Sequence, residues 1–269
     1  MTLIAALPMY DPPELEAAND TLWTAIADRL AARGVVGAPE RLTRGAPLDA
    51  VWSDPGLLLG QTCGYPLMTS LRDKVMVVAT PHYLAPGCEG PFCRSAVIVR
   101  QDSPAASLAD LRGARCAVND LASNSGMNLL RALIAPLAGG EAFFGALTVT
   151  GAHAASVERV ADGEADVAAI DCVTWAHLQR HHPAMAKRVR VLTWTAASPG
   201  LPMITAAAIG AATLAALRDA LGDVARDPSL RALRAELLLD TFSGPPASLY
   251  GAVLDLERSA VGQGYPSLQ

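Results

Sequence analysis

The chain has 269 residues, which is enough for one large domain or two lobes of ordinary size. Hydrophobic residues make up 51% and charged residues 17%, so the chain can bury a sizeable core. The formal net charge is −5 and no basic patch is present, which argues against a nucleic-acid-binding role. No stretch approaches the ~20 apolar residues of a membrane span, so we expect no direct membrane insertion.

The first third of the chain is predicted to alternate strands with a helix. Its apolar runs predict three strands, at residues 3–7, 57–62 and 75–79. A helix is predicted over about residues 14–32, where apolar residues recur at helical spacing, and Gly34 ends it. Residues 81–94, rich in proline and glycine, are predicted as a loop.

The rest of the chain continues the alternation. Further strands are predicted at residues 95–100, 115–118, 146–150, 166–170, 188–195 and 203–209. Helices are predicted after residue 129, at 153–161 and at 174–181, and two or three helices close the chain. Strands that alternate with alanine-rich helices indicate an α/β fold.

A turn of small polar residues separates the strand at 115–118 from the helix that follows it. Ser123, Asn124 and Ser125 are all good N-cap residues, and Gly126 permits a close approach by a ligand or by other backbone. Such a turn presents free N–H groups and the positive end of a helix dipole, which together favour an anion. A capped helix without a ligand is the alternative. Only one glycine is present, so the turn is neither a P-loop nor a dinucleotide fingerprint.

Polar side chains follow several predicted strands directly. Tyr10, Tyr65, the 123–125 turn, His153 and Asp171 each lie just beyond the carboxyl end of a strand. In open α/β sheets this edge is where ligands bind. We therefore expect these residues to gather at ligand-binding edges of the fold.

The five cysteines show no metal-binding motif. They contain no CxxC pair and no visible tetrahedral ligand set, so neither a metal nor a cofactor is predicted. Cys116 and Cys172 lie in apolar runs and are expected to be buried. Cys88 and Cys93 flank a short loop, and an oxidising compartment would allow them to pair.

Four segments carry a resemblance to a known family over about residues 3–243. They are Leu108-Ala-Asp-Leu-Arg-Gly113, Asn119-Asp-Leu-Ala-Ser-Asn-Ser-Gly126, Thr150-Gly-Ala-His153 and Gly163-Glu-Ala-Asp-Val-Ala-Ala-Ile-Asp171. With them the chain resembles the phosphate/phosphonate-type solute-binding proteins of ABC transporters, which have the bilobal type II periplasmic-binding-protein fold.

The resemblance implies two α/β lobes joined by a two-strand hinge. Lobe 1 would be discontinuous, with residues 1–94 plus 196–269, and lobe 2 would hold residues 95–195. The ligand, a small phosphonate or phosphate-like oxyanion, would lie in the cleft between the lobes. The ligand-binding residues implied in this way are Tyr10, Tyr65, Ser123, Asn124, Ser125, Gly126, His153 and Asp171.

Each implied role has a chemical reason. The turn at residues 123–126, the serine turn, would hold the phosphonate oxygens. His153 would add a donor, and the tyrosines of lobe 1 would cover the ligand. Asp171 would bind an amino group of a zwitterionic ligand, or accept a hydrogen bond from an anion that keeps a proton. The alternative for Asp171 is a cap on the helix that follows it.

The resemblance also implies the oligomeric state, the partner and the location of the protein. It indicates a monomer that is not an enzyme, delivers its ligand to an ABC permease and lies in the periplasm. The amino terminus lacks the basic region and cleavage site of a secretory signal, so a cytoplasmic location is expected if Met1 is the native start. The alternatives are a cytoplasmic ligand-binding protein, a ligand-sensing domain, or an enzyme of the same fold using Cys63 or His153 with Asp171.

Overall fold

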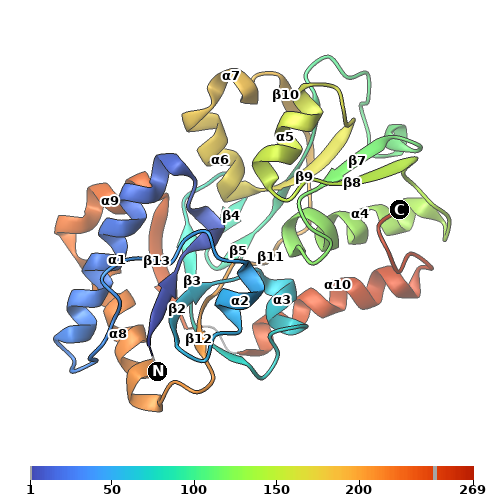
Figure 1. The fold of residues 1–269 in the computed structure, drawn as a ribbon. Coiled ribbons are helices and arrows are strands. Elements are labelled where there is room, and N and C mark those ends of the chain that lie inside the picture. The colour runs from blue at the N-terminus through green and yellow to red at the C-terminus, as the bar shows by residue number, and fades with distance from the viewer. Residues whose placement is uncertain (1, 245–246) are drawn as a thin grey trace. The chain divides into compact units, whose positions relative to one another are not determined.

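The computed structural model describes residues 2–244 and 247–269 and divides the chain into two compact units (Figure 1). Unit 1 comprises the described residues within Met1–Leu84, Glu89–Pro91 and Gly200–Leu249. Unit 2 comprises Ala85–Cys88, Phe92–Pro199 and Tyr250–Gln269. Both units are built on a five-stranded sheet. The chain therefore has the mixed α/β architecture that the sequence predicts.

Unit 1 has a sheet with the strand order β1-β2-β12-β3-β13, in which only the β1–β2 pair is parallel. Its strands are β1 (Ile4–Ala6), β2 (Leu57–Gln61), β3 (Val75–Tyr83), β12 (Met203–Ala206) and β13 (Leu239–Ser243). Its longer helices are α1 (Glu16–Ala31) and α8 (Ala211–Arg226). Shorter turns of helix are η1 (Pro8–Tyr10), η2 (Pro13–Leu15), α2 (Leu48–Trp52), α3 (Gly64–Met68), η5 (Pro228–Leu230) and α9 (Arg231–Glu236).

The core of unit 1 joins α1 and α8 to the sheet. Trp23 and Ile26 of α1 and Leu221 of α8 are fully buried with Leu58 and Leu59 of β2. The apolar spacing in residues 14–32 thus produces the buried face that it predicts, since these side chains fall on one stripe of the helix. Two features differ from the sequence prediction. Strand β3 extends to Tyr83, and a strand, β13, lies between the carboxyl-terminal helices.

Unit 2 has a sheet with the strand order β10-β6-β9-β7-β8. Its strands are β6 (Ser95–Arg100), β7 (Arg115–Val118), β8 (Ala146–Val149), β9 (Val167–Asp171) and β10 (Val189–Trp194). Strand β7 pairs in parallel with both β8 and β9, so the carboxyl ends of these three strands share one edge. We call this the carboxyl edge of unit 2.

The helices of unit 2 connect these strands. They are η3 (Ala109–Leu111), η4 (Asn124–Asn128), α4 (Leu129–Ala138), α5 (His153–Ala161), α6 (Cys172–His181), α7 (Pro183–Ala186) and α10 (Gly251–Gly262). Val157 and Val160 of α5 and Trp175 of α6 pack with Ile98 and Ile170 of the sheet in a common core. A small sheet has the order β11-β5-β4, from β11 (Ser198–Pro199), β5 (Phe92–Cys93) and β4 (Cys88–Glu89), and η6 spans Ala247–Tyr250.

The carboxyl terminus belongs to unit 2, whereas the resemblance places all of residues 196–269 in lobe 1. Helix α10 runs beside α4 in Figure 1. Asn128 Nδ2 donates to the carbonyl of Val253 at 3.0 Å, and Arg131 Nη1 donates to the carbonyl of Pro266 at 2.8 Å. These bonds, the first of them buried, help to hold residues 250–269 against the helix that follows the serine turn.

Candidate functional site

The serine turn begins a π-helical turn at the carboxyl edge of unit 2. Ser123 is the N-cap, with an extended backbone (φ −76°, ψ 132°), and its Oγ accepts a hydrogen bond from the Gly126 N–H at 3.0 Å. The turn η4 is π-helical, and the Asn128 N–H reaches the Ser123 carbonyl at 3.0 Å. The first N–H groups of a helix have no carbonyl partner within it, and they carry its positive end. The turn thus has the form of an anion site.

Gly126 permits two other side chains to approach the turn closely. A Cβ at this position would lie 1.8 Å from Asn119 Oδ1 and 3.2 Å from His153 Cε1. A side chain at position 126 would force the Asn119 amide to move, so glycine allows Asn119 to lie against the turn. The groups that approach Gly126 are thus side chains of the same unit, and the predicted approach of a ligand stays a prediction.

His153 lies against the serine turn. It is the first residue of α5, and its Nε2 lies 3.0 Å from Ser125 Oγ. Burial lowers the pKa of His153 to about 4, and a hydrogen bond with the backbone of Ala169 opposes this effect only in part. The imidazole is therefore neutral near pH 7 and has one N–H donor, whose position depends on the tautomer.

The side chains of two asparagines support the turn from within unit 2. Asn124 Nδ2 donates to Ser198 Oγ at 2.9 Å, and Asn128 Nδ2 donates to Asn124 Oδ1 at 2.9 Å. Arg131 Nη2 donates to Asn128 Oδ1 at 2.7 Å, and the Arg131 side chain is 4% exposed. Asn124 was predicted as a ligand-binding residue, and the structure places its amide in this internal network.

Asp171 ends β9 and caps α6. Its Oδ1 accepts hydrogen bonds from the N–H groups of Val173 at 2.9 Å and Thr174 at 3.0 Å, and the residue is 2% exposed. In the sheet Asp171 is paired with Ser95, whose hydroxyl donates to the Ser125 carbonyl at 2.8 Å. One oxygen of the Asp171 carboxylate therefore caps α6, as the alternative from the sequence expects. The Ser95 hydroxyl links β6 to the serine turn.

Tyr10 and Tyr65 both belong to unit 1. Tyr10 ends η1 after strand β1, and Tyr65 lies in α3 after strand β2, so each follows one strand of the parallel pair. The Tyr10 ring meets that of Tyr83 edge to face, with 5.1 Å between the centroids. Gln61 Nε2 donates to Tyr83 Oη at 3.1 Å. Tyr83 was not predicted, because the sequence reads as a loop from residue 81.

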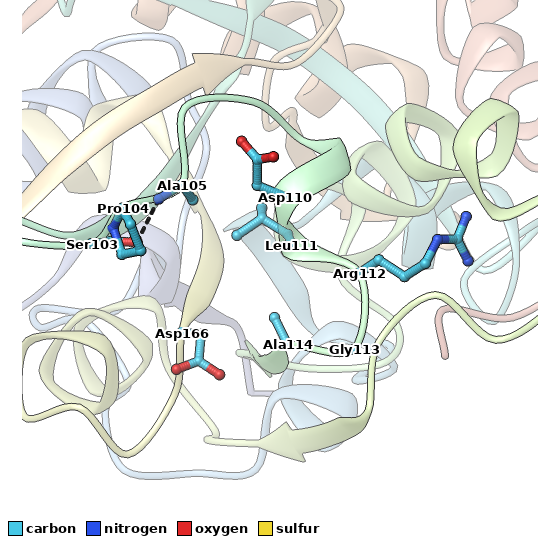
Figure 2. A pocket seen from close by; sticks show the side chains of 9 residues that line it. All are labelled: Ser103, Pro104, Ala105, Asp110, Leu111, Arg112, Gly113, Ala114 and Asp166. Atoms are coloured by element: carbon cyan, nitrogen blue, oxygen red, sulfur yellow. Dashed lines mark hydrogen bonds between the residues drawn. The ribbon is translucent and has the colours of Figure 1, made fainter.

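A separate hollow of about 510 Å³ lies at the opposite edge of the unit 2 sheet (Figure 2). Its lining includes Asp110, Arg112 and Asp166. Figure 2 shows the Arg112 side chain extending away from the hollow. The guanidinium lies 4.8 Å from the centre of the Phe143 ring and donates to the Leu137 carbonyl. The hollow thus has carboxylates in its wall and its arginine engaged elsewhere, so it suits an anion poorly.

A family model assigns the chain to a known class. Residues 59–250, more than half of the chain, match the family described as "ABC transporter, phosphonate, periplasmic substrate-binding protein". The chain therefore belongs to this family of transporter binding proteins. No curated protein matches the sequence at a significant level. Within the described residues, no helix has both the length and the apolar character needed to span a bilayer.

Solved structures of binding proteins share the fold. A binding-protein component of an ABC phosphonate transporter from Pseudomonas aeruginosa has a TM-score of 0.79 at 14% identity, over 98% of this chain and 89% of that one. The PhnD1 protein of Prochlorococcus marinus in complex with methylphosphonate has a TM-score of 0.74 at 14% identity, over 97% and 99%. A Xanthomonas citri protein bound to ATP has a TM-score of 0.72 at 18% identity, over 98% of both chains. At these identities the likeness shows the bilobal binding-protein fold.

Proposed function

We propose that this chain binds a small phosphonate or related phosphate-type oxyanion through the serine turn of unit 2. The observation that carries the proposal is the contact between Ser125 Oγ and His153 Nε2 at the start of η4. Ser123 and Ser125 are 5% and 7% exposed, so their hydroxyls stand in a site with little water. Hydrogen bonds to a charged acceptor are strongest under these conditions. The family and the ligands named for two similar structures support the same anion class.

The positive ends of three helices strengthen this proposal. The helices that begin at Asn124, His153 and Cys172 all follow the carboxyl ends of β7, β8 and β9. Each contributes a partial positive charge at that edge. The buried guanidinium of Arg131 lies in the helix that follows η4, but Glu257, 3.6 Å away, offsets much of its charge. An anion can thus be held by neutral donors without a direct contact to lysine or arginine.

The proposal assigns distinct roles to the predicted residues. Ser123, Ser125 and His153 supply side-chain donors, whereas Asn124 and Gly126 act through the backbone and the shape of the turn. Asp171 selects a ligand with an ammonium group or an anion that keeps a proton, and Tyr10 and Tyr65 supply aromatic cover. The same proposal includes a monomer that works in the periplasm and delivers its ligand to an ABC permease.

The enzyme alternative has less support. Asp171 Oδ1 is committed to the cap of α6, and His153 Nε2 contacts Ser125. A histidine with a pKa of about 4 is a weak general base near pH 7, because its pKa is far below the ambient pH. The family is also one of transporter binding proteins.

A ligand screen tests the proposal. Purified protein, stripped of bound ligand, is titrated with methylphosphonate, an aminoalkylphosphonate, phosphate, ATP and sulfate while its melting temperature is followed. A ligand at 100 times its dissociation constant adds about 2.7 kcal/mol, which raises the melting temperature by roughly 5–10 °C for a chain of this length. A rise with a phosphorus oxyanion and none with sulfate is expected. A flat response to every phosphorus compound would overturn the proposal.

Asp171→Asn tests the selection of a zwitterion. Asparagine is a good N-cap residue, so the α6 cap is retained and the fold is expected to persist. The variant should bind the aminoalkylphosphonate about tenfold less tightly, while its affinity for methylphosphonate changes by less than about threefold. Calorimetric titration of both ligands measures the difference. An equal loss for both ligands would remove the ammonium role of Asp171.

A further inference from the structure

Three cysteines that are separated in the sequence meet in unit 2. Cys88 comes from β4, Cys93 ends β5, and Cys172 is the first residue of α6. Cys88 Sγ lies 3.5 Å from Cys93 Sγ and 3.3 Å from Cys172 Sγ, and all three sulfur atoms lie within 4.8 Å of one another. We call this group the three-cysteine cluster. None of its members is a proposed ligand-binding residue, although Cys172 follows Asp171 and Cys93 pairs with Ser198 in the small sheet.

The backbone holds the cluster in place. Gly87 has a positive φ of 98°, and a Cβ there would lie 2.7 Å from Trp194 Cζ3 and 3.0 Å from Cys172 Cβ. The Arg94 N–H donates to the Gly87 carbonyl at 3.0 Å, and the Cys172 N–H donates to the Arg94 carbonyl at 3.2 Å. These constraints press the segment before Cys88 onto the start of α6, so the three sulfurs are brought together before any ligand binds.

The geometry points to a three-thiolate site for a soft metal ion. We propose that Cys88, Cys93 and Cys172 bind Cu(I) in a three-coordinate arrangement. Thiolates select soft ions such as Cu(I) over hard ones such as Mg²⁺ or Ca²⁺. Metal–sulfur bonds of about 2.3 Å place the sulfurs of a trigonal site about 4 Å apart, which needs only small side-chain shifts here. Each ligating thiol releases its proton to solvent, and no electron is transferred.

Burial and charge favour a cation with few ligands. Cys172 is fully buried and Cys93 is 6% exposed, whereas Cys88 is half-buried and offers the way in. Among the described residues the group has three potential ligands, one fewer than a closed structural zinc site uses. The carboxylate of Asp171 acts electrostatically on Cys88 and Cys93. A cation bound by the three sulfurs therefore has a negative group nearby, which opposes the positive end of α6 at Cys172.

Copper titration of the full chain tests the proposal. Reduced, oxygen-free protein is titrated with Cu(I) against a chromogenic Cu(I) chelator, and copper per chain is measured by elemental analysis after desalting. We expect one copper per chain for the wild type. Cys93→Ser and Cys172→Ser should each lower the affinity at least about 100-fold, because one of three ligands is lost. Cys116→Ser is the matched control, since Cys116 is equally buried in unit 2 and lies outside the cluster.

Two further variants guard against loss of folding. Cys88→Ser changes the half-buried member of the cluster, and Gly87→Ala keeps all three thiols but disturbs their spacing. Both should weaken copper binding while circular dichroism and methylphosphonate titration report a folded protein. Copper binding is measured without phosphonate, so its failure is distinct from a failure of the proposed function.

Three results would overturn the proposal. The first is no copper uptake by the reduced wild type. The second is unchanged uptake by Cys172→Ser. The third combines two measurements. A thiol titration of the denatured protein, as purified, finds two cysteines of the cluster joined in a disulfide, and the protein still binds no copper after that disulfide is reduced.

Discussion

The two edges of the unit 2 sheet differ in how their polar groups are satisfied. At the carboxyl edge the polar side chains are buried, and Ser125 and His153, which lie side by side, are neutral near pH 7. At the opposite edge the groups are charged, exposed and paired. Arg115 forms an ion pair with Asp166 at 2.8 Å, and the Asp110 carboxylate accepts from Ser107.

Under the proposed function, the anion site is marked by the chemistry of the groups around it and not by the presence of a hollow. The opposite edge has the 510 Å³ hollow but has already used its charges within the protein. Helix direction adds to the contrast. The helices that follow β7, β8 and β9 begin at the carboxyl edge, so their positive ends lie there.

Gly126→Ala should have the largest effect, because it alters the carboxyl edge sterically. The added Cβ would collide with Asn119 Oδ1 and displace the turn or the asparagine. We expect methylphosphonate affinity to fall about 100-fold or more, equal to ~2.7 kcal/mol. Gly251→Ala in the same unit is the control, because nothing lies within 4 Å of its Cβ position. Equal affinities for the two variants by calorimetry would contradict the proposed site.

Ser125→Ala should come next, with a loss of about 10–100-fold in affinity. The variant removes one hydrogen bond to a charged ligand, worth about 1.5–3 kcal/mol. Ser107→Ala is the matched change at the opposite edge, where the Ser107 hydroxyl donates to Asp110 Oδ2. Its affinity should stay within about twofold of the wild type. If Ser107→Ala weakened binding as much as Ser125→Ala, the two edges would have been assigned the wrong way round.

The two edges should also lose stability in different pH ranges. The folded pKa of His153, about 4, is below its unfolded value of 6.5, so the unfolded chain takes up the proton first. Its contribution is present above pH 6.5 and is lost as the pH falls toward 4, by about 1–3 kcal/mol. At the opposite edge, Arg115 lowers the pKa of Asp166, so that contribution is lost only as the pH falls below about 3.8.

Urea unfolding at several pH values measures this separation. His153→Gln should flatten the decline between pH 6.5 and 4, and Asp166→Asn should not. Burial also lowers the pKa of His177 in α6 to about 4 and lowers the pKa of His82 in β3, so His177→Gln and His82→Gln are needed to account for the remaining decline. A decline that His153→Gln leaves unchanged would rule out the neutral, buried state assigned to His153.

Asp110→Asn should have the smallest effect. Its carboxylate accepts from the N–H groups of Ala106 and Ser107, and asparagine can replace one such acceptor. We expect methylphosphonate affinity to remain within about twofold of the wild type. A large loss of affinity would make the opposite edge part of the binding site.

Local patterns predicted much of the fold and of the carboxyl edge. The strand before residue 119, the cap at Ser123 and the helix start at His153 are all properties of short segments, so sequence periodicity and capping rules find them. The closeness of Ser125 and His153 also follows, since parallel neighbours β7 and β8 end at the same edge.

Contacts between distant segments were not predicted. Ser95 and Ser198 reach the serine turn from segments that carry no local signal for that role. Residues 250–269 join unit 2 through contacts with distant segments, among them bonds to Asn128, Arg131 and the backbone of Phe143. The three-cysteine cluster was missed for the same reason, because Cys172 is 84 residues from Cys88 along the chain.

A crystal structure of the wild-type protein with methylphosphonate tests the central claim most directly. We expect the phosphonate oxygens within hydrogen-bond distance of the Ser123 and Ser125 hydroxyls, the first N–H groups of η4 and His153 Nε2. Phosphonate bound in the hollow beside Asp110 and Asp166, or held by lysine and arginine with the serine turn empty, would contradict the account.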